Sequence, residues 1–387
     1  MSADPDRVLA SQAHRLAQKS AALSALPPAT RPALQSMLRT VNTYYSNLIE
    51  GQSTHPVAVD RAIRAGMETQ TPGVLISLAL REAEETIATR QAVAAFERPT
   101  TPEFIRHIHE LIFSKIPESA RRTTAAEGDR TIVVEPGVFR AVDVQVARHV
   151  TIAYGQLAGA LSRFDEQYRP DRVSLRGDQG LIAAAAAHHR LVFLYPFADG
   201  NGRVARLFSG VYIDSVLEQP AIWSLSRGLA RSREQYYRHL AEADAPRQGD
   251  LDGRSPRSQR ALYTFCAYFL ARCIDQVDYM AELLNIDGYK HRVEYLVRQA
   301  NQSALPGIPR LDSGAEGVLK AVFIEGELTR AEASQRTGYK ERMGRNVLQH
   351  LLKEGLLVSD NQRGPVRPGF PAAYLEYLFP KMAGADY

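Results

Sequence analysis

A short stretch between two helical segments constrains this chain most strongly. Residues 181–194 have the apolar pattern of a packed helix, and Pro196 ends it. A polar loop with two glycines follows, and a second helix begins with Arg203 and Arg206 one turn apart. Because glycines lack side chains, backbone N–H groups can converge where the second helix starts, and that helix end carries partial positive charge. The stretch therefore predicts a phosphate site with two guanidinium groups for the outer oxygens.

The same loop carries a carboxylate, Asp199, placed to hold a divalent cation beside the phosphates. The alternative is an ordinary Gly-Asn-Gly turn that happens to precede basic residues. We favour the phosphate site, because one loop of fixed length combines an acid, two glycines, an amide and two spaced arginines.

The residues from Tyr195 to Arg206, Tyr-Pro-Phe-Ala-Asp-Gly-Asn-Gly-Arg-Val-Ala-Arg, resemble the signature of the Fic (Fic/Doc) family, H-x-F-x-[D/E]-G-N-G-R-x-x-R. Every signature position matches except the first, where Tyr195 stands in place of histidine. In members with the full signature, that histidine is the general base that deprotonates a hydroxyl of a target protein. AMP is then transferred from ATP to Ser, Thr or Tyr. The resemblance implies a protein AMP-transferase, a nucleotidyltransferase, with ATP or another nucleotide and Mg²⁺ as cofactors.

The resemblance also implies a role for each matching residue. Mg²⁺ is expected at Asp199, and the β- and γ-phosphates at the two arginines. The residues expected to hold the nucleotide are Gly200, Asn201, Gly202, Arg203 and Arg206. The expected catalytic residues are Tyr195, at the general-base position, Asn201 and Arg203.

Tyrosine at position 195 should weaken the transfer. A general base works best with a pKa near ambient pH, about 6.5 for histidine and about 10 for tyrosine. At neutral pH about one tyrosine in a thousand is ionised, a handicap of roughly 4 kcal/mol. Positive charge from Mg²⁺ and Arg203 would recover part of it. Nucleotide binding does not depend on this residue, so binding is expected even where turnover is slow.

A second pattern, Ser46-x-x-x-Glu50-Gly51, lies far upstream. It is similar to the inhibitory motif [S/T]-x-x-x-E-[G/N] of Fic proteins with an N-terminal inhibitory helix, here about residues 33–51. In those proteins the glutamate pairs with the second signature arginine, here Arg206, and excludes the γ-phosphate from a productive pose. Ser46 and Glu50 share one helix face, and a carboxylate on the guanidinium would block the phosphate. A solvated glutamate is the alternative, which the downstream signature disfavours.

Helical patterns dominate the chain and predict a mainly α fold in three parts. Residues 1–95 form N-terminal helices that include the inhibitory helix, and residues 96–300 form the Fic helical core and a helical extension. A linker rich in Pro, Gly and Ser precedes a small winged-helix (α+β) domain at 312–387. Alternation over residues 132–146, with a Pro136–Gly137 turn, predicts a β-hairpin. In Fic proteins a hairpin here, the flap, aligns the target by strand addition; a hairpin that only caps the core is the alternative.

The C-terminal part predicts a winged helix-turn-helix. Its helices are expected at 315–324, 328–336 and 340–354, with Thr329 as an N-cap, followed by a two-stranded wing with Gly364 at its tip. The basic residues of the third helix and wing, suited to DNA phosphates, are Lys340, Arg342, Arg345, His350, Lys353, Arg363 and Arg367. Protein docking or dimerisation is the alternative use of this module.

Composition bears on location. No window approaches 18 consecutive apolar residues, so no transmembrane span is expected, and the polar residues 1–7 lack the apolar core of a signal peptide. The two cysteines, Cys266 and Cys273, lie two turns apart on one helix and are expected to be buried free thiols. These features predict a cytoplasmic protein. A net charge of +4 permits nucleic-acid contact without demanding it.

We therefore expect an ATP-binding Fic protein, autoinhibited by Glu50, whose AMP transfer is weakened by Tyr195. One alternative is a nucleotide-sensing, DNA-binding transcription regulator without catalysis. Another is a deAMPylase, in which Glu50 and the metal on Asp199 activate water. The expected partners are a nucleotide, a target protein with a Ser, Thr or Tyr hydroxyl, and DNA through residues 312–387. A homodimer stays open, and no membrane is expected.

Overall fold

The computed structural model describes residues 5–65, 71–91, 98–124, 131–146, 149–171 and 177–382. Helices dominate, as predicted. Those of the N-terminal part are α1 (Pro5–Leu23), α2 (Arg31–Ile49), α3 (Pro56–Ala65) and α4 (Pro72–Gln91). Those of the central part are α5 (Pro102–Phe113), α6 (Leu157–Tyr168), α7 (Asp178–Leu194), α8 (Asn201–Leu217), α9 (Leu225–Ala230), α10 (Arg233–Ala243), α11 (Gln259–Leu283) and α12 (Ile286–Asn301). Short 3₁₀ turns lie at Pro28–Thr30, Glu118–Ala120, Tyr154–Gln156 and Ala372–Tyr374.

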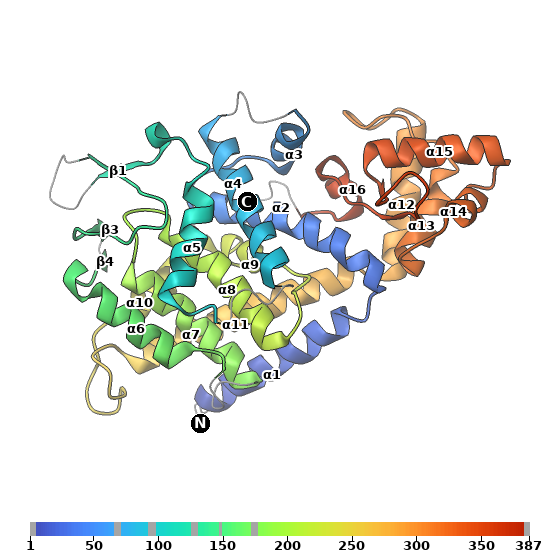
Figure 1. The fold of residues 1–387 in the computed structure, drawn as a ribbon. Coiled ribbons are helices and arrows are strands. Elements are labelled where there is room, and N and C mark those ends of the chain that lie inside the picture. Colours follow the sequence, from blue (N-terminus) through green and yellow to red (C-terminus); the bar gives the residue numbers. More distant parts are fainter. Residues whose placement is uncertain are drawn as a thin grey trace.

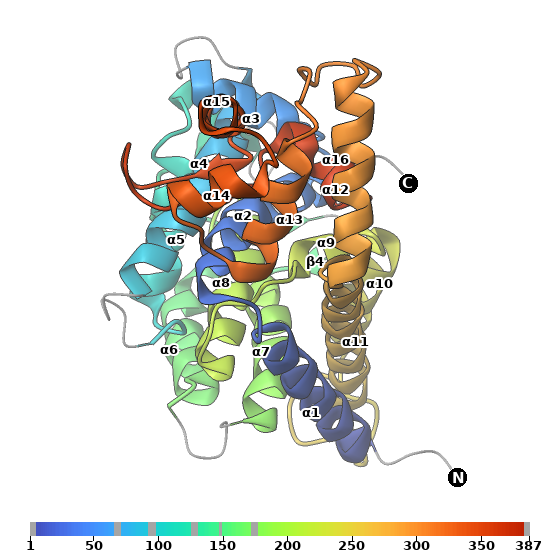
Figure 2. The ribbon, with the colours of Figure 1, turned by 90° about the vertical axis from the view of Figure 1, so that its right-hand side faces the viewer.

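The centre of the molecule is the pair α7 and α8, which pack on each other and are covered by α11, α5 and α2 (Figure 1). Small residues permit close contact of α7 with its neighbours, since Ala184, Ala185 and Ala187 are fully buried. The first helix, α1, packs along α11 and α7, so the start of the described chain closes one side of this core (Figure 2). The core thus holds the loop between α7 and α8 in a fixed place.

Helix α2 brings the upstream pattern to this loop. Its apolar side, which includes Leu34, Leu38 and Val41, is buried against α4, α8 and α9. The helix ends at Glu50, and Gly51 follows with φ of +82°, a left-handed conformation that glycine adopts without strain. The last turn of α2 therefore stops beside the N-terminus of α8.

The strands correct one sequence prediction. Residues 132–146 do not form a hairpin about Pro136–Gly137: β2 (Thr131–Val133) pairs antiparallel with the earlier β1 (Arg122–Thr124), and β3 (Gln145–Val146) pairs with β4 (His149–Val150). Pro136 and Gly137 do form a turn, but the chain continues away from β2 after it. Alternation and a turn signal are local, whereas the pairing partner is chosen by the whole fold. A hairpin is thus present, one strand earlier than predicted.

The C-terminal elements lie where the sequence places them. They are α13 (Ala315–Glu325), α14 (Arg330–Arg336), α15 (Glu341–Glu354), the antiparallel strands β5 (Leu357–Val358) and β6 (Arg367–Pro368), and α16 (Leu375–Leu378). Thr329 caps α14 in a capping box with Glu332. Leu328 pairs with Val366 and so adds a third short segment to the strand pair. The module stands to one side of the core, beyond α12 (Figure 1).

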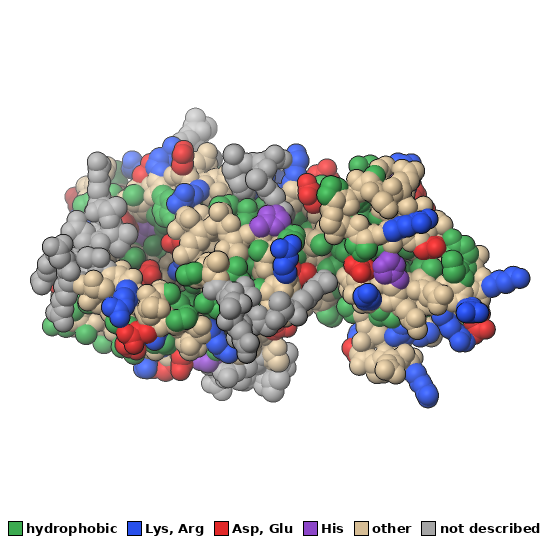
Figure 3. Space-filling view, turned by 90° about the horizontal axis from the view of Figure 1, so that it is seen from above, with side chains coloured by type: hydrophobic (Ala, Val, Ile, Leu, Met, Phe, Trp, Pro, Cys, Tyr) green, Lys and Arg blue, Asp and Glu red, His purple; other side chains and the backbone are tan. Residues whose placement is uncertain are grey.

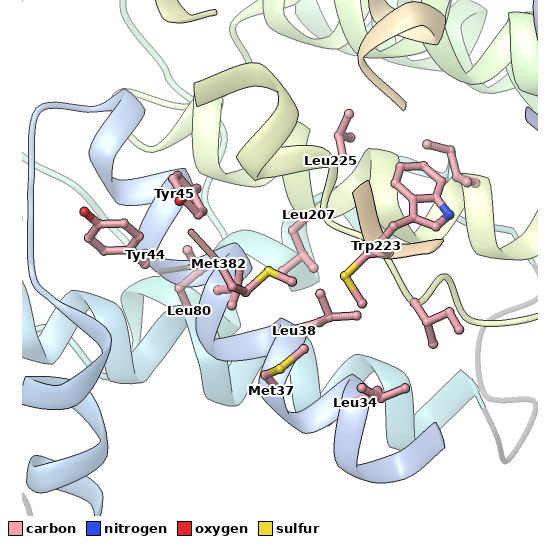
Figure 4. Packing of buried hydrophobic residues seen from close by; sticks show 14 of the residues in the cluster. Leu34, Met37, Leu38, Tyr44, Tyr45, Leu80, Leu207, Trp223, Leu225 and Met382 are labelled. Carbon is pink, nitrogen blue, oxygen red and sulfur yellow. The ribbon is translucent and has the colours of Figure 1, made fainter. Parts of the chain in front are cut away.

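The end of the described chain ties this module to the core. The buried guanidinium of Arg227 on α9 donates two hydrogen bonds to the carbonyl of Lys381 and lies 3.7 Å from the ring centre of Tyr279. Met382 packs into the same apolar cluster as Tyr45 and Leu80 (Figure 4). The C-terminal module is therefore anchored against α2, α4, α9 and α11.

Two further expectations concern the protein as a whole. Cys266 and Cys273 are buried free thiols, and burial raises the pKa of both, to about 12 for Cys266. None of the helices in the described ranges is both long and apolar enough to cross a membrane.

Candidate nucleotide site

The loop between α7 and α8 begins with a left-handed residue and is held by hydrogen bonds from Arg140. Tyr195 ends α7 with φ of +49°, a left-handed conformation that is uncommon outside glycine, and Pro196 prevents the helix from continuing. The carbonyl of Tyr195 accepts from Nε of Arg140 at 2.8 Å, and the carbonyl of Pro196 accepts from the Arg140 N–H at 2.9 Å. Arg140, whose side chain is fully buried, thereby fixes the direction in which the loop leaves α7.

Asn201 closes the loop on itself. Its side-chain oxygen accepts from the N–H of Phe197 at 2.9 Å, and its side-chain nitrogen donates to the carbonyl of the same residue at 2.8 Å. Both polar groups of this buried amide are thus engaged. The side chain therefore shapes the loop, and the predicted contact of Asn201 with the nucleotide stays a prediction.

The N-terminus of α8 is built for close approach. Gly200 precedes it with φ of +83°, and a Cβ on Gly200 would overlap the ring of Phe113. A Cβ on Gly202 would overlap the carboxylate of Glu50. Among the described residues no side chain caps this helix, so its first N–H groups stay available. An uncapped helix N-terminus, with glycines that let a ligand approach the backbone closely, can bind an anion.

His109 packs against the loop and was not predicted from the sequence. Its ring stacks between Phe197, at 3.9 Å between centres, and Phe113, at 4.3 Å. Nδ1 accepts from the N–H of Gly137 at 2.9 Å, so Nε2 carries the proton and donates to the carbonyl of Asp199 at 3.3 Å. Burial lowers the pKa of His109 to about 3. The imidazole is therefore neutral and holds the loop in place. No sequence signal marked it, since it lies in an ordinary amphipathic helix.

Arg203 is buried and already oriented. Its Nε donates to the side-chain oxygen of Asn47 on α2 at 3.0 Å. Asn47 in turn donates to the hydroxyl of Ser77 on α4 at 3.0 Å. This chain of bonds uses Nε and leaves the two terminal nitrogens of Arg203 for a ligand.

Arg206 is occupied by α2. Its Nε donates to the hydroxyl of Ser46 and its Nη2 to the carbonyl of Ser46, both at 2.9 Å, and Nη2 also donates to the carboxylate of Glu50 at 2.6 Å. The Arg206 side chain is 2% exposed and that of Glu50 29%. Burial alone would raise the pKa of Glu50, but Arg206 and Arg203 outweigh it and lower that pKa. The structure thus joins Ser46, Glu50 and Arg206 as the sequence predicted.

Tyr195 lies in surroundings that oppose ionisation. Burial raises the pKa of its hydroxyl to about 12, and the nearby Asp199 carboxylate contributes to the rise. Positive charge from Arg203 was expected to lower the pKa of Tyr195, but no cationic side chain among the described residues does so. At neutral pH, less of this tyrosine is ionised, and so able to act as a base, than its residue type alone suggests.

Asp199 fits a metal only together with a nucleotide. Within the part of the chain that the structure describes, no group of three or more His, Cys, Asp or Glu side chains could hold a metal ion. One oxygen of Asp199 accepts from the N–H of Gly200 at 2.6 Å, which orients the carboxylate at the mouth of the loop. Mg²⁺ is commonly held by one or two carboxylates plus substrate phosphates, so a single carboxylate beside a phosphate cradle suits it.

Several basic residues on the surface of the C-terminal module are paired with acidic neighbours. Arg345 pairs with Glu341, Arg367 with Asp360, and His350 lies 3.8 Å from Glu354. The exposed basic residues of this surface further include Lys340, Arg342, Lys353 and Arg363. Lysine and arginine side chains project from this end of the molecule, clear of the core (Figure 3). The surface is less basic than the sequence count suggests, because several charges are matched within it.

Comparison with known proteins identifies the central part of the chain. Residues 99–213 match the model of the Fic/DOC family. This segment runs from just before α5 into α8 and contains the whole loop with Asp199, Arg203 and Arg206, but not Glu50. The chain therefore contains a Fic/DOC family domain.

Relatives and solved structures agree with this assignment. "Protein adenylyltransferase Fic" of Culex quinquefasciatus is 32% identical over 118 residues, 30% of this chain and 22% of that protein. The protein of the same name from Nematostella vectensis is 26% identical over 236 residues, 60% of this chain and 47% of that protein. The chain thus spans less than half the length of these curated relatives.

Two crystal structures share the fold. One is a Fic domain containing signaling protein from Bacteroides thetaiotaomicron, with a TM-score of 0.52, 18% identity, and coverage of 69% of this chain and 94% of that chain. The other is a Fic family protein from Desulfovibrio desulfuricans, with a TM-score of 0.51, 17% identity, and coverage of 93% and 95%. The predicted mainly α Fic fold is confirmed.

Proposed function

We propose that this chain binds Mg²⁺–ATP at the N-terminus of α8 and transfers AMP to a protein hydroxyl, slowly, under inhibition by Glu50. The observation that carries the proposal is the pairing of Glu50 with Arg206 directly over Gly202. The name of the relatives, protein adenylyltransferase, supports the class of reaction.

Binding rests on groups that are present and oriented. The first turn of α8 has uncapped N–H groups and carries Arg203, whose charge interacts with that of nearby Asp199. Mg²⁺, when bound, would neutralise phosphate charge and orient the nucleotide. Arg203 needs no rearrangement, because Asn47 holds only its Nε.

Inhibition follows from competition for Arg206. A γ-phosphate requires the guanidinium that Ser46 and Glu50 occupy. Displacing Glu50 also requires movement of the end of α2, where the hydroxyl of Tyr237 donates to the carbonyl of Ile49 at 3.0 Å. The inhibited arrangement is thus stabilised by several bonds, and release needs a ligand or partner that favours another one.

The chemical step is the weak part of this enzyme. With a pKa of about 12 for Tyr195, ionising its hydroxyl to the phenolate at neutral pH costs roughly 7 kcal/mol. Tyr195 would then contribute little to activating the substrate hydroxyl, and Mg²⁺, where bound, would supply positive charge near it together with Arg203. We infer slow transfer rather than none.

A nucleotide-sensing regulator is the second candidate. Two observations favour it: the raised pKa of Tyr195, and the contact of the C-terminal module with the turn that leads into α2, where Gly326 lies against Pro27. A deAMPylase is less favoured, because Arg206 lowers the pKa of Glu50 and so makes it a poorer base for activating water.

Auto-labelling with ATP carrying a labelled α-phosphate tests the proposal. We expect little label on the wild type, more on Glu50→Gly, and much more on Glu50→Gly combined with Tyr195→His. Equal labelling of the last two would show that Tyr195 does not limit the reaction. Absence of label on the double variant, with Mg²⁺–ATP binding intact, would favour the regulator.

A further inference from the structure

A pocket of about 260 Å³ lies between α2, α4, α8 and α9. It reaches Arg203 and Arg206 at one end and extends from there along the flank of α8. Its apolar lining includes Leu38, Leu80, Leu207, Leu225 and Trp223 (Figure 4). A cavity of about 150 Å³ in another protein accommodates benzene, so this pocket is large enough for a fused two-ring compound.

Two carboxylic groups face this pocket. Glu84 accepts from the side-chain nitrogen of Asn42 at 2.6 Å through one oxygen, and Asp214 accepts from the N–H of Ala221 at 2.8 Å. The second oxygen of each has no hydrogen-bond partner among the described residues. Burial raises the pKa of Glu84 to about 8 and that of Asp214 to about 7, and Asp214 contributes to the shift of Glu84. The charges of Arg39 and Arg81 oppose the rise in the pKa of Glu84 but do not cancel it.

The three arginines that line the pocket are engaged with other groups. Arg203 and Arg206, at one end of the pocket, are hydrogen-bonded to α2, and Arg39, which also lines the pocket, lies 3.7 Å from Glu85. The indole N–H of Trp223 is buried and has no acceptor in the described ranges. An aromatic or hydrogen-bonding ligand would meet an unused donor as well as unused carboxylate oxygens.

Gly210 keeps the pocket open. It lies within α8, where glycine is disfavoured relative to alanine, and it lines the pocket. A Cβ at this position would meet no atom within 4 Å. The helix thus has a destabilising residue where any side chain would take up pocket volume.

We propose that this pocket binds a small organic amine with an aromatic body, its ammonium group between Glu84 and Asp214 and its ring beside Leu38, Leu207 and Trp223. The proposal concerns a second ligand and holds whether or not the nucleotide site turns over. Leu38, with Asn42 and Ser46, belongs to α2, so an occupied pocket also stabilises α2 in its present position.

Calorimetry on the full chain with tryptamine tests this site. Tryptamine is charged at neutral pH, and tryptophol has the same ring system with a hydroxyl in place of the amine. We expect tryptamine to bind and tryptophol to bind at least ~10-fold more weakly. No heat from tryptamine on the wild type, or equal affinity for the two compounds, would overturn the proposal.

Variants locate the binding. Glu84→Gln combined with Asp214→Asn keeps the size of both side chains and should weaken tryptamine at least ~10-fold, whereas Glu82→Gln, a surface residue of α4 paired with Lys115, should not. Gly210→Leu should abolish binding while raising the melting temperature, which separates loss of the pocket from loss of the fold. Unchanged tryptamine affinity in the double variant and in Gly210→Leu would place the ligand elsewhere and refute the site.

Discussion

The guanidinium of Arg206 donates a 2.6 Å hydrogen bond to the carboxylate of Glu50, a residue 156 positions earlier in the chain. The same guanidinium also donates to two oxygens of Ser46. One buried side chain thereby fixes the last turn of α2 over the N-terminus of α8. Any phosphate that needs Arg206 must compete with α2, so nucleotide affinity and the position of α2 are linked.

Glu50→Gln should raise the affinity for Mg²⁺–ATP. The amide keeps the shape of the side chain but removes the charge that opposes a phosphate, and we expect about 10-fold tighter binding, or about 1.4 kcal/mol. The nucleotide-free variant should lose on the order of 2 kcal/mol of stability, because Arg206 stays buried without its counter-ion. Calorimetry and thermal unfolding measure both effects, with the exposed Glu234→Gln as control. An unchanged affinity would show that Glu50 does not compete with the nucleotide.

Arg203→Ala should weaken Mg²⁺–ATP at least ~10-fold, because its terminal nitrogens are the free cationic donors beside the α8 N-terminus. Arg238→Ala, an exposed arginine on α10, is the matched control. Calorimetry in the Glu50→Gly background removes the competition for Arg206. Equal affinities with and without Arg203 would mean that the phosphates bind elsewhere.

His109→Phe should loosen the loop while preserving the ring stack. The N–H of Gly137 and the carbonyl of Asp199 lose their partner, which we expect to reduce stability by about 2 kcal/mol and to weaken Mg²⁺–ATP binding. The folded-state pKa of about 3 lies below the ordinary value, so the unfolded state binds the extra proton between about pH 6.5 and 3. Wild-type stability therefore falls as pH drops through that window.

The variant should lose that part of the pH dependence. Melting temperatures of wild type and His109→Phe at pH 7 and pH 5 are the measurement, and the difference between the two proteins should narrow at the lower pH. A constant difference would mean that His109 is not held neutral.

The sequence predicted local features of this protein better than long-range ones. Pro196 and the glycines of the loop define where α7 ends and α8 begins, and the Ser46–Glu50 spacing places both on one helix face. The pairing of β2 with β1 was not predictable, because alternation identifies a strand but not its partner. His109 was missed for the same reason: its hydrogen-bond partners, Gly137 and Asp199, are distant from it in the sequence.

The sequence also did not show which charged residues are paired or how burial changes a pKa. The third helix of the C-terminal module was expected to be basic, yet Arg345 is paired with Glu341 one turn away. Tyr195 illustrates the same limit, since its residue type gives a pKa near 10 and only its burial explains a value of about 12.

DNA binding by the C-terminal module is the last prediction. Arg342 and Lys353 are exposed on α15, so each should contact a phosphate if this helix enters a groove. Replacing either by alanine should lower the slope of log affinity against log salt by about one unit, roughly equally for all sequences. Arg345→Ala should have a smaller effect, because Glu341 already neutralises its charge.

DNA binding should be measured on the full chain, because the hydrogen bonds between Arg227 and Lys381 anchor the C-terminal module to the core. Mobility shifts on genomic fragments around the encoding gene, at several salt concentrations, measure the slope, and Arg238→Ala is again the control. Adding Mg²⁺–ATP tests the regulator. If nucleotide displaces Glu50 and α2 shifts, the C-terminal module, which contacts the turn leading into α2, should change its affinity for DNA. Absence of binding at low salt would make the module a protein-docking element and remove the main support for a regulator.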